Sequence, residues 1–255
     1  TDASAVLDGH WGFGQVVMSQ ASSMAVEKAA RCGVAALTVR NANHIGRLGS
    51  YVEHIANRGM VGLLFANMHG SAACVVPWGG REGRLGTNPI AAGLPRPNAD
   101  PIVLDMTTSV VAEGKIRVQR NRGASVPEGW IIDADGESTT DPAAFYGPPR
   151  GGLLPFGGAA GHKGYGLSVL IEILGGALSG AGCAGSGSRN GNGVLLLVVD
   201  IGRFVPMESY MSEVGQLVEF VKSSPLSPGY TEIWVPGEIE SRERADRSEG
   251  FEVDE

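Results

Sequence analysis

Glycine is the residue type that most constrains the fold of this chain. There are 39 glycines among 255 residues, about twice the share found in an average protein. They follow no three-residue period, which excludes a collagen-like helix. Hydrophobic residues make up 43% and charged residues 18% of the chain, enough apolar material for a buried core. We therefore expect a globular chain with many tight turns and close backbone approaches, typical of an enzyme built around a ligand.

Charge and cysteine content exclude several classes of partner. The net charge of -7 offers no positive surface for nucleic acid. The longest apolar runs, at 166–178 and 194–199, are too short to span a bilayer. Three widely spaced cysteines and five unpaired histidines predict neither disulfides nor a metal site. We therefore expect a cytoplasmic protein without nucleic-acid or membrane partners.

The first hundred residues alternate between helical and extended patterns. Apolar spacing predicts helices over 15–32 and 49–58, and each is followed by a glycine. Short apolar runs predict buried strands over 34–39 and 60–66. This strand–helix–strand order with short links favours an α/β layer with at least partly parallel strand pairing.

The rest of the chain adds further elements around a turn-rich middle. A strand over 102–104 precedes a helix that ends near residue 120, and the Asp135-Gly136 turn predicts a hairpin. The later patterns predict an apolar helix over 165–178, a mobile Gly/Ser-rich surface loop over 180–193, a strand over 194–199, an amphipathic helix over 209–221, a strand over 232–235 and a charged helix up to residue 250.

Residues 180–185 match the G-x-G-x-x-G string of dinucleotide-binding folds. That fingerprint requires a strand before it and a helix after it. Here a predicted helix precedes the string and a Ser/Gly/Asn-rich segment follows it. A chain with 39 glycines produces such a match easily, so we interpret the string as a flexible insertion and not as a phosphate-binding loop.

His44 is the strongest candidate for a catalytic residue. It lies between a predicted buried strand and the next predicted helix, and loops at the carboxyl ends of strands are where ligands bind in α/β sheets. A histidine titrates near neutral pH, which suits a general acid and base. The alternative, from position alone, is a histidine that caps the following helix.

Two other stretches lie where helices begin. Residues 105–109 follow a predicted strand, and their amides and hydroxyls suit a phosphate or a ribose; the alternative is a plain helix cap by Thr108 or Ser109. Lys163 precedes an apolar helix, where a cation opposes the helix dipole. An anionic ligand would explain a lysine at that position.

Seven short motifs stand in order along the chain: Asn-His-Ile-Gly from residue 43, Pro-Trp-Gly-Gly from 77, Gly-Thr-Asn-Pro from 86, Asp-Met-Thr-Thr-Ser from 105, Thr-Thr-Asp-Pro from 139, His-Lys-Gly-Tyr-Gly from 162 and Val-Pro-Gly-Glu from 235. In this order they resemble the malate/L-lactate dehydrogenase family of NAD(P)-dependent oxidoreductases. That family includes ureidoglycolate, sulfolactate and hydroxycarboxylate dehydrogenases and cyclic imino acid reductases. The His-Ile-Gly-Arg form, which starts at His44, resembles the hydroxycarboxylate dehydrogenase branch most.

The resemblance implies an α/β fold in which a mixed sheet with helices forms a family-specific dinucleotide-binding fold, not a standard Rossmann fold. It also implies a homodimer with NAD or NADP as cofactor. By matching positions it implies that His44 donates and accepts the proton and that Thr87 and Asn88 lie near the substrate. The implied cofactor contacts are Asp105, Met106, Thr107, Lys163, Gly237 and Glu238.

The resemblance also implies how the chain is divided. Residues 1–110 belong to a substrate and dimer domain, 60–235 to an interleaved cofactor-binding domain, and 236–255 to a C-terminal segment. Family members usually begin with a helical segment bearing Ser-His-Gly and an arginine that hold the substrate carboxylate, and they usually continue further. This chain begins with Thr1 and has no Ser-His-Gly, so we expect a chain shortened at both ends.

The shortened chain leaves Arg47, three residues after His44, as the candidate for the substrate carboxylate; the alternative is a surface role on the following helix. We expect residues 1–255 alone to bind cofactor but to turn over little substrate. The predicted function is hydride transfer between NAD(P) and a 2-hydroxy acid/2-oxo acid pair of the malate, lactate or aryl-lactate type. The alternatives are a cyclic imino acid reductase of the same family and an inactive dimerising or ligand-binding remnant.

Overall fold

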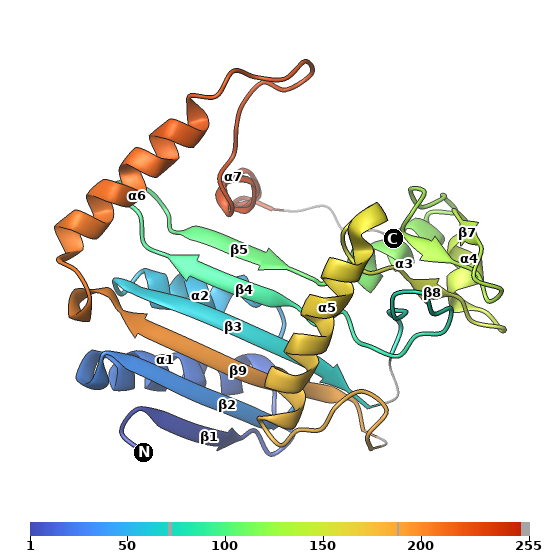
Figure 1. The fold of residues 1–255 in the computed structure, drawn as a ribbon, viewed down its shortest axis with the longest axis horizontal. Coiled ribbons are helices and arrows are strands. Elements are labelled where there is room, and N and C mark those ends of the chain that lie inside the picture. Colours follow the sequence, from blue (N-terminus) through green and yellow to red (C-terminus); the bar gives the residue numbers. More distant parts are fainter. Residues whose placement is uncertain (71–72, 188, 251–255) are drawn as a thin grey trace.

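The computed structural model describes residues 1–70, 73–187 and 189–250, and its largest feature is a six-stranded sheet (Figure 1). In spatial order the strands are β1 (Ser4–Asp8), β2 (Val34–Ala42), β9 (Gly191–Asp200), β3 (Met60–His69), β4 (Ile90–Leu94) and β5 (Ile102–Met106). The β1–β2 pair is parallel, and all other neighbours pair antiparallel. The predicted mixed α/β fold is confirmed.

The position of β9 shows how the sheet is joined. β9 lies between β2 and β3 and pairs antiparallel with both, so those two strands are not hydrogen-bonded to each other, and the expected partly parallel pairing is present between β1 and β2. Leu196 of β9 faces Leu37 on one side and Leu64 on the other. The end of the predicted 180–193 loop belongs to this strand, because β9 already begins at Gly191.

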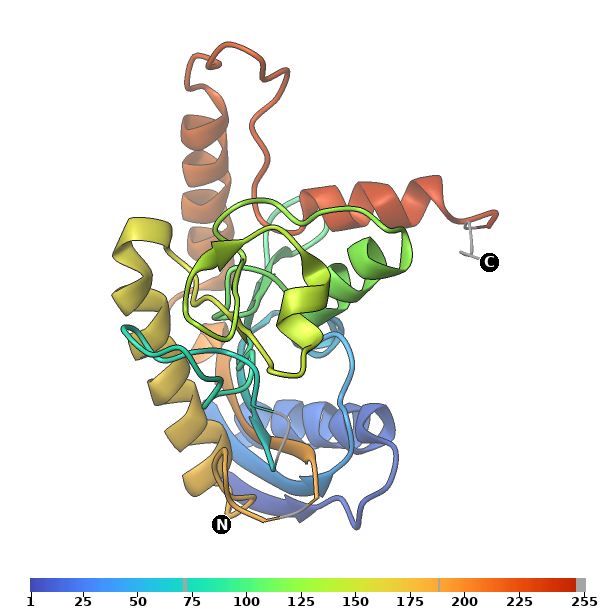
Figure 2. The same cartoon turned by 90° about the vertical axis from the view of Figure 1, so that its right-hand side faces the viewer.

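Helices cover both faces of the sheet. Helices α1 (Gly14–Cys32) and α2 (Gly49–Ala56) pack on one face. The other face carries α5 (Gly161–Ile171), which continues as the π-helix η2 (Glu172–Ala177). Figure 2 shows α1 (blue) and α5 (yellow) on opposite sides of the sheet. The predicted 165–178 helix is therefore present, but it begins earlier and changes its winding at Glu172.

A second, smaller unit follows β5 in sequence. Its elements are α3 (Glu113–Asn121), β6 (Ile131–Ile132), β7 (Ser138–Thr139), α4 (Pro142–Tyr146) and β8 (Gly152–Leu153). The β6–β7 pair is the predicted hairpin, and β8 joins β6 on the other side. The unit has its own buried apolar cluster around Phe145, separate from the cluster under the large sheet. The division into a 1–110 and an interleaved 60–235 domain stays a prediction.

The C-terminal part differs from the sequence prediction in one element. Helix α6 (Met207–Lys222) matches the amphipathic prediction, and α7 (Glu238–Asp246) matches the charged one. Residues 232–235 form no strand; instead the segment runs beside β5, where Val103 N donates to Pro236 O at 3.0 Å. Within the described residues, no helix is long and apolar enough to cross a bilayer.

One carboxylate connects this C-terminal part to the sheet. The Glu238 side chain accepts hydrogen bonds from Arg96 in the β4–β5 connection, from Lys222 at the end of α6 and from the Val235 amide, at 2.8, 2.8 and 3.0 Å. Partial burial opposes ionisation, but these donors outweigh it and lower the pKa of Glu238 from 4.5 to about 2. The pair with Lys222 ties the end of α6, whose side chains are at most partly buried, to this segment.

The contact between η2 and the sheet requires glycine. A Cβ on Gly193 would lie 2.2 Å from Gly175 O and 2.8 Å from Asn67 Oδ1. We expect Gly193→Ala to lower the free energy of unfolding by about 2–3 kcal/mol, because backbone would have to move. The control is Gly166→Ala on α5, where a Cβ meets nothing within 4 Å; it should raise stability by about 0.5–1 kcal/mol. Chemical denaturation measures both, and a neutral Gly193→Ala contradicts the packing argument.

The ion pairs of Glu238 predict a pH-dependent stability. Since the folded state lowers this pKa, the stabilisation is present above pH 4.5 and is lost as the pH falls toward 2. Glu238→Gln should lower the free energy of unfolding by about 2–3 kcal/mol at pH 7, with a smaller difference at pH 3. Glu243→Gln removes an exposed ion pair with Arg247 and should change little. If both variants lose the same free energy of unfolding, the partly buried ion pairs of Glu238 stabilise the fold no more than an exposed pair does.

Candidate functional site

His44 lies in the loop between β2 and α2, residues 43–48, which we call the His44 loop. Its imidazole is exposed, and the Gly46 amide donates to Nδ1 at 3.1 Å. This bond places the proton of the neutral ring on Nε2, which has no partner among the described residues. The next residue, Ile45, is buried, and its amide donates to Asn192 Oδ1 at 3.1 Å. The loop is thus anchored below the histidine, whose Nε2 is left for a ligand.

A cavity of about 450 Å³ lies against His44, between the large sheet and the smaller unit. The large sheet side contributes Met68 at the end of β3 and Thr87. The smaller unit contributes the beginning of α3 and two side chains from its connections. The full lining is His44, Met68, Cys74, Thr87, Ala112, Glu113, Gly114, Arg117 and Arg150.

Two arginines from the smaller unit bring positive charge to the cavity. Arg117 is paired with Glu113 at 2.6 Å. Arg150 stacks over the Phe145 ring at 5.5 Å and has no ion pair among the described residues. Cys74 is buried, and burial raises the pKa of its thiol to about 11, so the thiol stays neutral. Arg150 is therefore the cation that this cavity offers to an anionic ligand.

Thr87 and Asn88 are adjacent in sequence but have different surroundings in the structure. Thr87 lines the His44 cavity, and its carbonyl accepts from the amide and the hydroxyl of Thr108 at 2.9 and 3.0 Å. Asn88 is fully buried: its amide donates to Glu172 at 2.6 Å and its Oδ1 accepts from the Met68 amide at 3.2 Å. Asn88 thus holds the turn of residues 86–88, which we call the Thr87 turn, and does not line the cavity.

Arg47 lies outside the His44 cavity. Its guanidinium contacts Glu53 at 3.1 Å and Asp105 at 4.0 Å, so two carboxylates already compensate its charge. It lines a different hollow, with α7 on the other side. Although Arg47 follows His44 by three residues, the structure does not bring the two side chains to one site.

The stretch from Asp105 to Thr107 lies at the end of β5. Asp105 accepts the first amide of α2, Gly49 N, at 2.7 Å; burial nevertheless raises the pKa of Asp105 because it outweighs this bond. Met106 pairs with Ile90 in the sheet, and the Thr107 hydroxyl donates to Ser109 O at 3.0 Å. The stretch is thus an ordered end of an edge strand.

The beginning of α5 lies beside this stretch. The Phe156 amide donates to Thr108 O at 2.9 Å, and Gly164 packs so closely on Phe156 that a Cβ would lie 2.1 Å from its carbonyl oxygen. Lys163 is exposed in the first turn of α5, whose N-cap residue Ala160 makes no side-chain cap. The first turn of α5, with an ammonium beside it, suits an anion.

Gly237 and Glu238 lie on the outer side of β5. Gly237 has a φ of +96° as the N-cap of α7, and a Cβ there would lie 3.0 Å from Val103 N. The backbone of this pair therefore lies against Val103, on the same strand as Asp105. The Glu238 carboxylate is occupied by Arg96 and Lys222, as described above.

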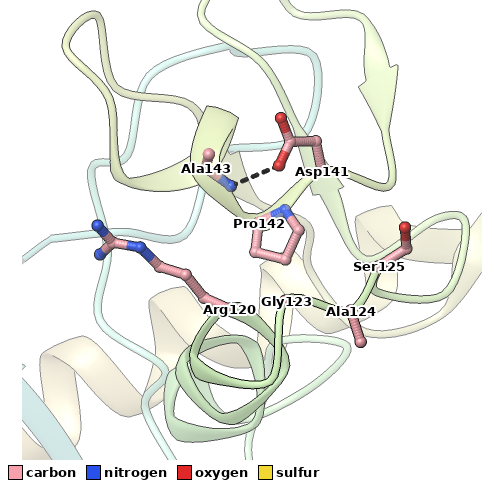
Figure 3. Close-up of a pocket in the computed structure, with 7 residues that line it drawn as sticks. All are labelled: Arg120, Gly123, Ala124, Ser125, Asp141, Pro142 and Ala143. Atoms are coloured by element: carbon pink, nitrogen blue, oxygen red, sulfur yellow. Dashed lines mark hydrogen bonds between the residues drawn. The ribbon is translucent and has the colours of Figure 1, made fainter.

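Two further hollows contain none of the predicted site residues. Figure 3 shows one of about 250 Å³ beside α3 and α4, lined by Arg120, Gly123, Ala124, Ser125, Asp141, Pro142 and Ala143. Its Asp141 accepts the Ala143 amide at 2.8 Å and thereby caps α4. The described residues include no group of three or more His, Cys, Asp or Glu that could hold a metal ion.

Sequence reasoning missed the cationic side of the cavity. Arg117 and Arg150 belong to the smaller unit and come to His44 only through tertiary folding. Arg150 follows two prolines in a Pro- and Gly-rich connection, which carries no chemical signal by itself. Glu172 did carry a signal, since it is a single carboxylate within a long apolar run.

Comparison with known proteins identifies the relatives of this chain. The family model of malate/L-lactate dehydrogenase matches residues 1–255. A malate dehydrogenase of Pyrococcus horikoshii is 40% identical over 92% of this chain and 66% of its own length. A Δ1-pyrroline-2-carboxylate/Δ1-piperideine-2-carboxylate reductase of Pseudomonas putida is 37% identical over 93% of this chain and 68% of its length.

A solved structure agrees with these matches. The sulfolactate dehydrogenase of Methanocaldococcus jannaschii has a TM-score of 0.85 and 38% identity, covering 100% of this chain and 73% of that one. The chain spans about two thirds of the length of the curated relatives it matches. With a family model that matches from end to end and a shared fold, this chain belongs to the malate/L-lactate dehydrogenase family.

Proposed function

We propose that this protein interconverts a 2-hydroxy acid and a 2-oxo acid with NAD or NADP as cofactor. One observation carries the proposal: His44, with an unpartnered Nε2, lines the same cavity as Thr87 and the unpaired cation of Arg150. A proton donor and a carboxylate binder in one cavity are what reduction of a 2-oxo acid needs. The family of the chain supports the same reaction.

His44 moves the proton in this proposal. In the direction of reduction, protonated His44 donates from Nε2 to the substrate carbonyl oxygen as the carbonyl carbon is reduced. In the direction of oxidation, His44 with its ring proton on Nδ1 accepts the hydroxyl proton at Nε2. Both of these steps place a proton on Nδ1, so the bond from the Gly46 amide to Nδ1 holds the resting ring and opens during turnover. When bound, NAD(P) supplies or accepts the hydride.

The donor set beside β5 fits a dinucleotide. Lys163 and the first turn of α5, which has no side-chain cap, suit a pyrophosphate, and the Asp105–Thr107 stretch offers a carboxylate and a hydroxyl. The Gly237 backbone approaches the same strand closely. We propose that these residues, with Glu238 as the support of the segment and Asn88 as the support of the Thr87 turn, form the binding surface around the cavity. The separate G-x-G-x-x-G string is not part of it.

Arg150 replaces Arg47 as the proposed binder of the substrate carboxylate. Arg47 is paired with Glu53 and lies outside the cavity. Arg150 has a planar, permanently charged guanidinium that matches a carboxylate, and Thr87 lies on the same lining. Lactate- or malate-type substrates share this carboxylate next to the reacting carbon.

A cyclic imino acid reductase is the second candidate function, favoured by the relative of that name in Pseudomonas putida. It would use the same carboxylate binder and cofactor, but the proton would go to a ring nitrogen. Parallel assays with pyruvate, oxaloacetate, phenylpyruvate and a cyclic imino acid, each with NADH and NADPH, separate the two functions. If none of these substrates is turned over, the remaining alternative is an inactive dimerising or ligand-binding remnant.

We propose a homodimer in a reducing compartment such as the cytosol. Helix α6 presents exposed Leu217, Phe220 and Val221 on its outer side, which suits a second copy of the chain. The three cysteines are free thiols.

The proton-transfer role of His44 is tested by His44→Gln. We expect turnover to fall by about 10²–10⁴-fold, because glutamine cannot exchange a proton at the Nε2 position. Cofactor binding, followed by the fluorescence of NADH, should stay nearly unchanged. His54→Gln is the matched control: His54 lies on α2, bonds to Arg58 and does not line the cavity. Near-normal turnover of the His44 variant would remove the proposed assignment.

The role of Arg150 is tested by Arg150→Gln. Loss of one charged hydrogen bond, about 1–3 kcal/mol, should raise KM for the 2-oxo acid by about 5–150-fold. Arg81→Gln is the control, because Arg81 lines a neighbouring hollow but not the His44 cavity. If both variants keep the wild-type KM, the carboxylate is bound elsewhere.

A further inference from the structure

We propose that Glu172 is a positioning residue of this site. It lies where α5 becomes η2, on the sheet face opposite α1. Its carboxylate, which does not line the cavity, fixes the His44 loop and the Thr87 turn relative to each other. The expected effect on kcat rests on the proposed function. The hydrogen-bond connection between the His44 loop and the Thr87 turn does not.

The Glu172 side chain is only 6% exposed and is surrounded by donors. Oε1 accepts from Asn67 Nδ2 at 2.8 Å and from the Ala184 amide at 2.7 Å. Oε2 accepts from Asn88 Nδ2 at 2.6 Å. All three contacts come from N–H groups, so both oxygens act as acceptors. Such a buried carboxylate is stable only while its donors stay in place.

One arm of this network reaches the catalytic loop. Asn67, fully buried on β3, accepts at its backbone carbonyl from Asn192 Nδ2 at 2.8 Å. Asn192, on β9, accepts at Oδ1 from the Ile45 amide at 3.1 Å. Ile45 directly follows His44. The carboxylate is therefore connected to the His44 loop through two asparagines.

The second arm reaches the Thr87 turn. Asn88 has a φ of +35° and is held on both sides, by Glu172 at Nδ2 and by the Met68 amide at Oδ1. The preceding residue, Thr87, lines the cavity together with His44. The positions of His44 and Thr87, two cavity residues that are far apart in sequence, thus depend on the two carboxylate oxygens of Glu172.

The same carboxylate also gives the G-x-G-x-x-G string a role. Ala184 within it donates to Glu172, and Gly182 O accepts from Asn67 Nδ2 at 3.0 Å. The predicted flexible surface loop is therefore held against a buried network over this part. The string acts as a backbone partner of Glu172 and is not part of the cavity lining.

The donor and acceptor roles at the contact between Glu172 and Asn88 can be exchanged by substitution. Glu172→Gln puts an amide donor opposite the donors, so one contact must break. Asn88→Asp puts two acceptors together at the 2.6 Å contact. In the double variant Glu172→Gln/Asn88→Asp, the glutamine amide donates to the new carboxylate, and the Met68 amide keeps its acceptor. Ser168 Oγ, at 3.2 Å from Asn88 Nδ2, can turn and donate to the same new carboxylate, whereas the Ser168 carbonyl, which accepts from Asn88 Nδ2 at 3.2 Å, loses this donor.

We expect each single variant to lower kcat by about 10²-fold, the effect of a misplacement of about 1 Å, with KM for the cofactor unchanged. The double variant should regain most of kcat, since contacting groups couple strongly. Ser179→Ala is the control: it removes buried hydrogen bonds at the end of the same helical segment without touching the asparagines.

The decisive readouts are the backbone amides of Ile45 and Met68, one on each arm, observed by NMR with hydrogen exchange. In Glu172→Gln the amide on the broken arm should shift and exchange faster; in the double variant it should return, and in Ser179→Ala neither amide should change. If both amides are unmoved in Glu172→Gln, the proposal is overturned, whatever happens to kcat. Should a single variant fail to fold, a double variant that folds with wild-type exchange at both amides supports the proposal and one that does not overturns it. A His44→Gln variant with full activity refutes the proposed function but leaves this linkage test intact.

Discussion

The structure depends on the insertion of β9 between β2 and β3. Residues on β3 and β9 that meet are far apart in the chain, as shown by Asn67 and Asn192 at a separation of 125 positions. Closing so long a connection costs entropy, and the apolar run of β9, buried on both faces over most of its length, offsets that cost. Once β9 is in place, the ends of β2 and β3 lie on either side of Asn192.

The elements of the fold were largely predictable because their signals are local. The 3.6-residue spacing before Gly33 and the short apolar run after it predict α1 and β2, and both are present. The neighbours of each strand were not predictable. An apolar run buried on both faces fits equally well next to either partner, so the sequence predicts partly parallel pairing but not that β9 separates β2 from β3. The missed strand β1 lies at the edge, with Val6 exposed, and has only a weak pattern.

The site shows the same limit at the level of single side chains. His44 was predictable, since a loop from a buried strand to a helix places it at the end of the sheet. Arg47 was predicted from sequence proximity, but the start of α2 turns it toward Glu53. Arg150 takes the place at the cavity because the smaller unit folds around Phe145 and brings the connection after α4 to His44. No local pattern encodes a contact made by two units.

Glu172 shows what a polar residue can do that an apolar one cannot. Burying a carboxylate costs several kcal/mol, and a leucine at this place would fill the same space. An apolar side chain, however, holds its neighbours by contact alone and allows them to slide. Two carboxylate oxygens with three directed N–H bonds define where Asn67, Asn88 and Ala184 must lie. Those positions fix the two sides of the cavity. The buried charge therefore lowers the stability of the fold, and its hydrogen bonds set where His44 and Thr87 lie.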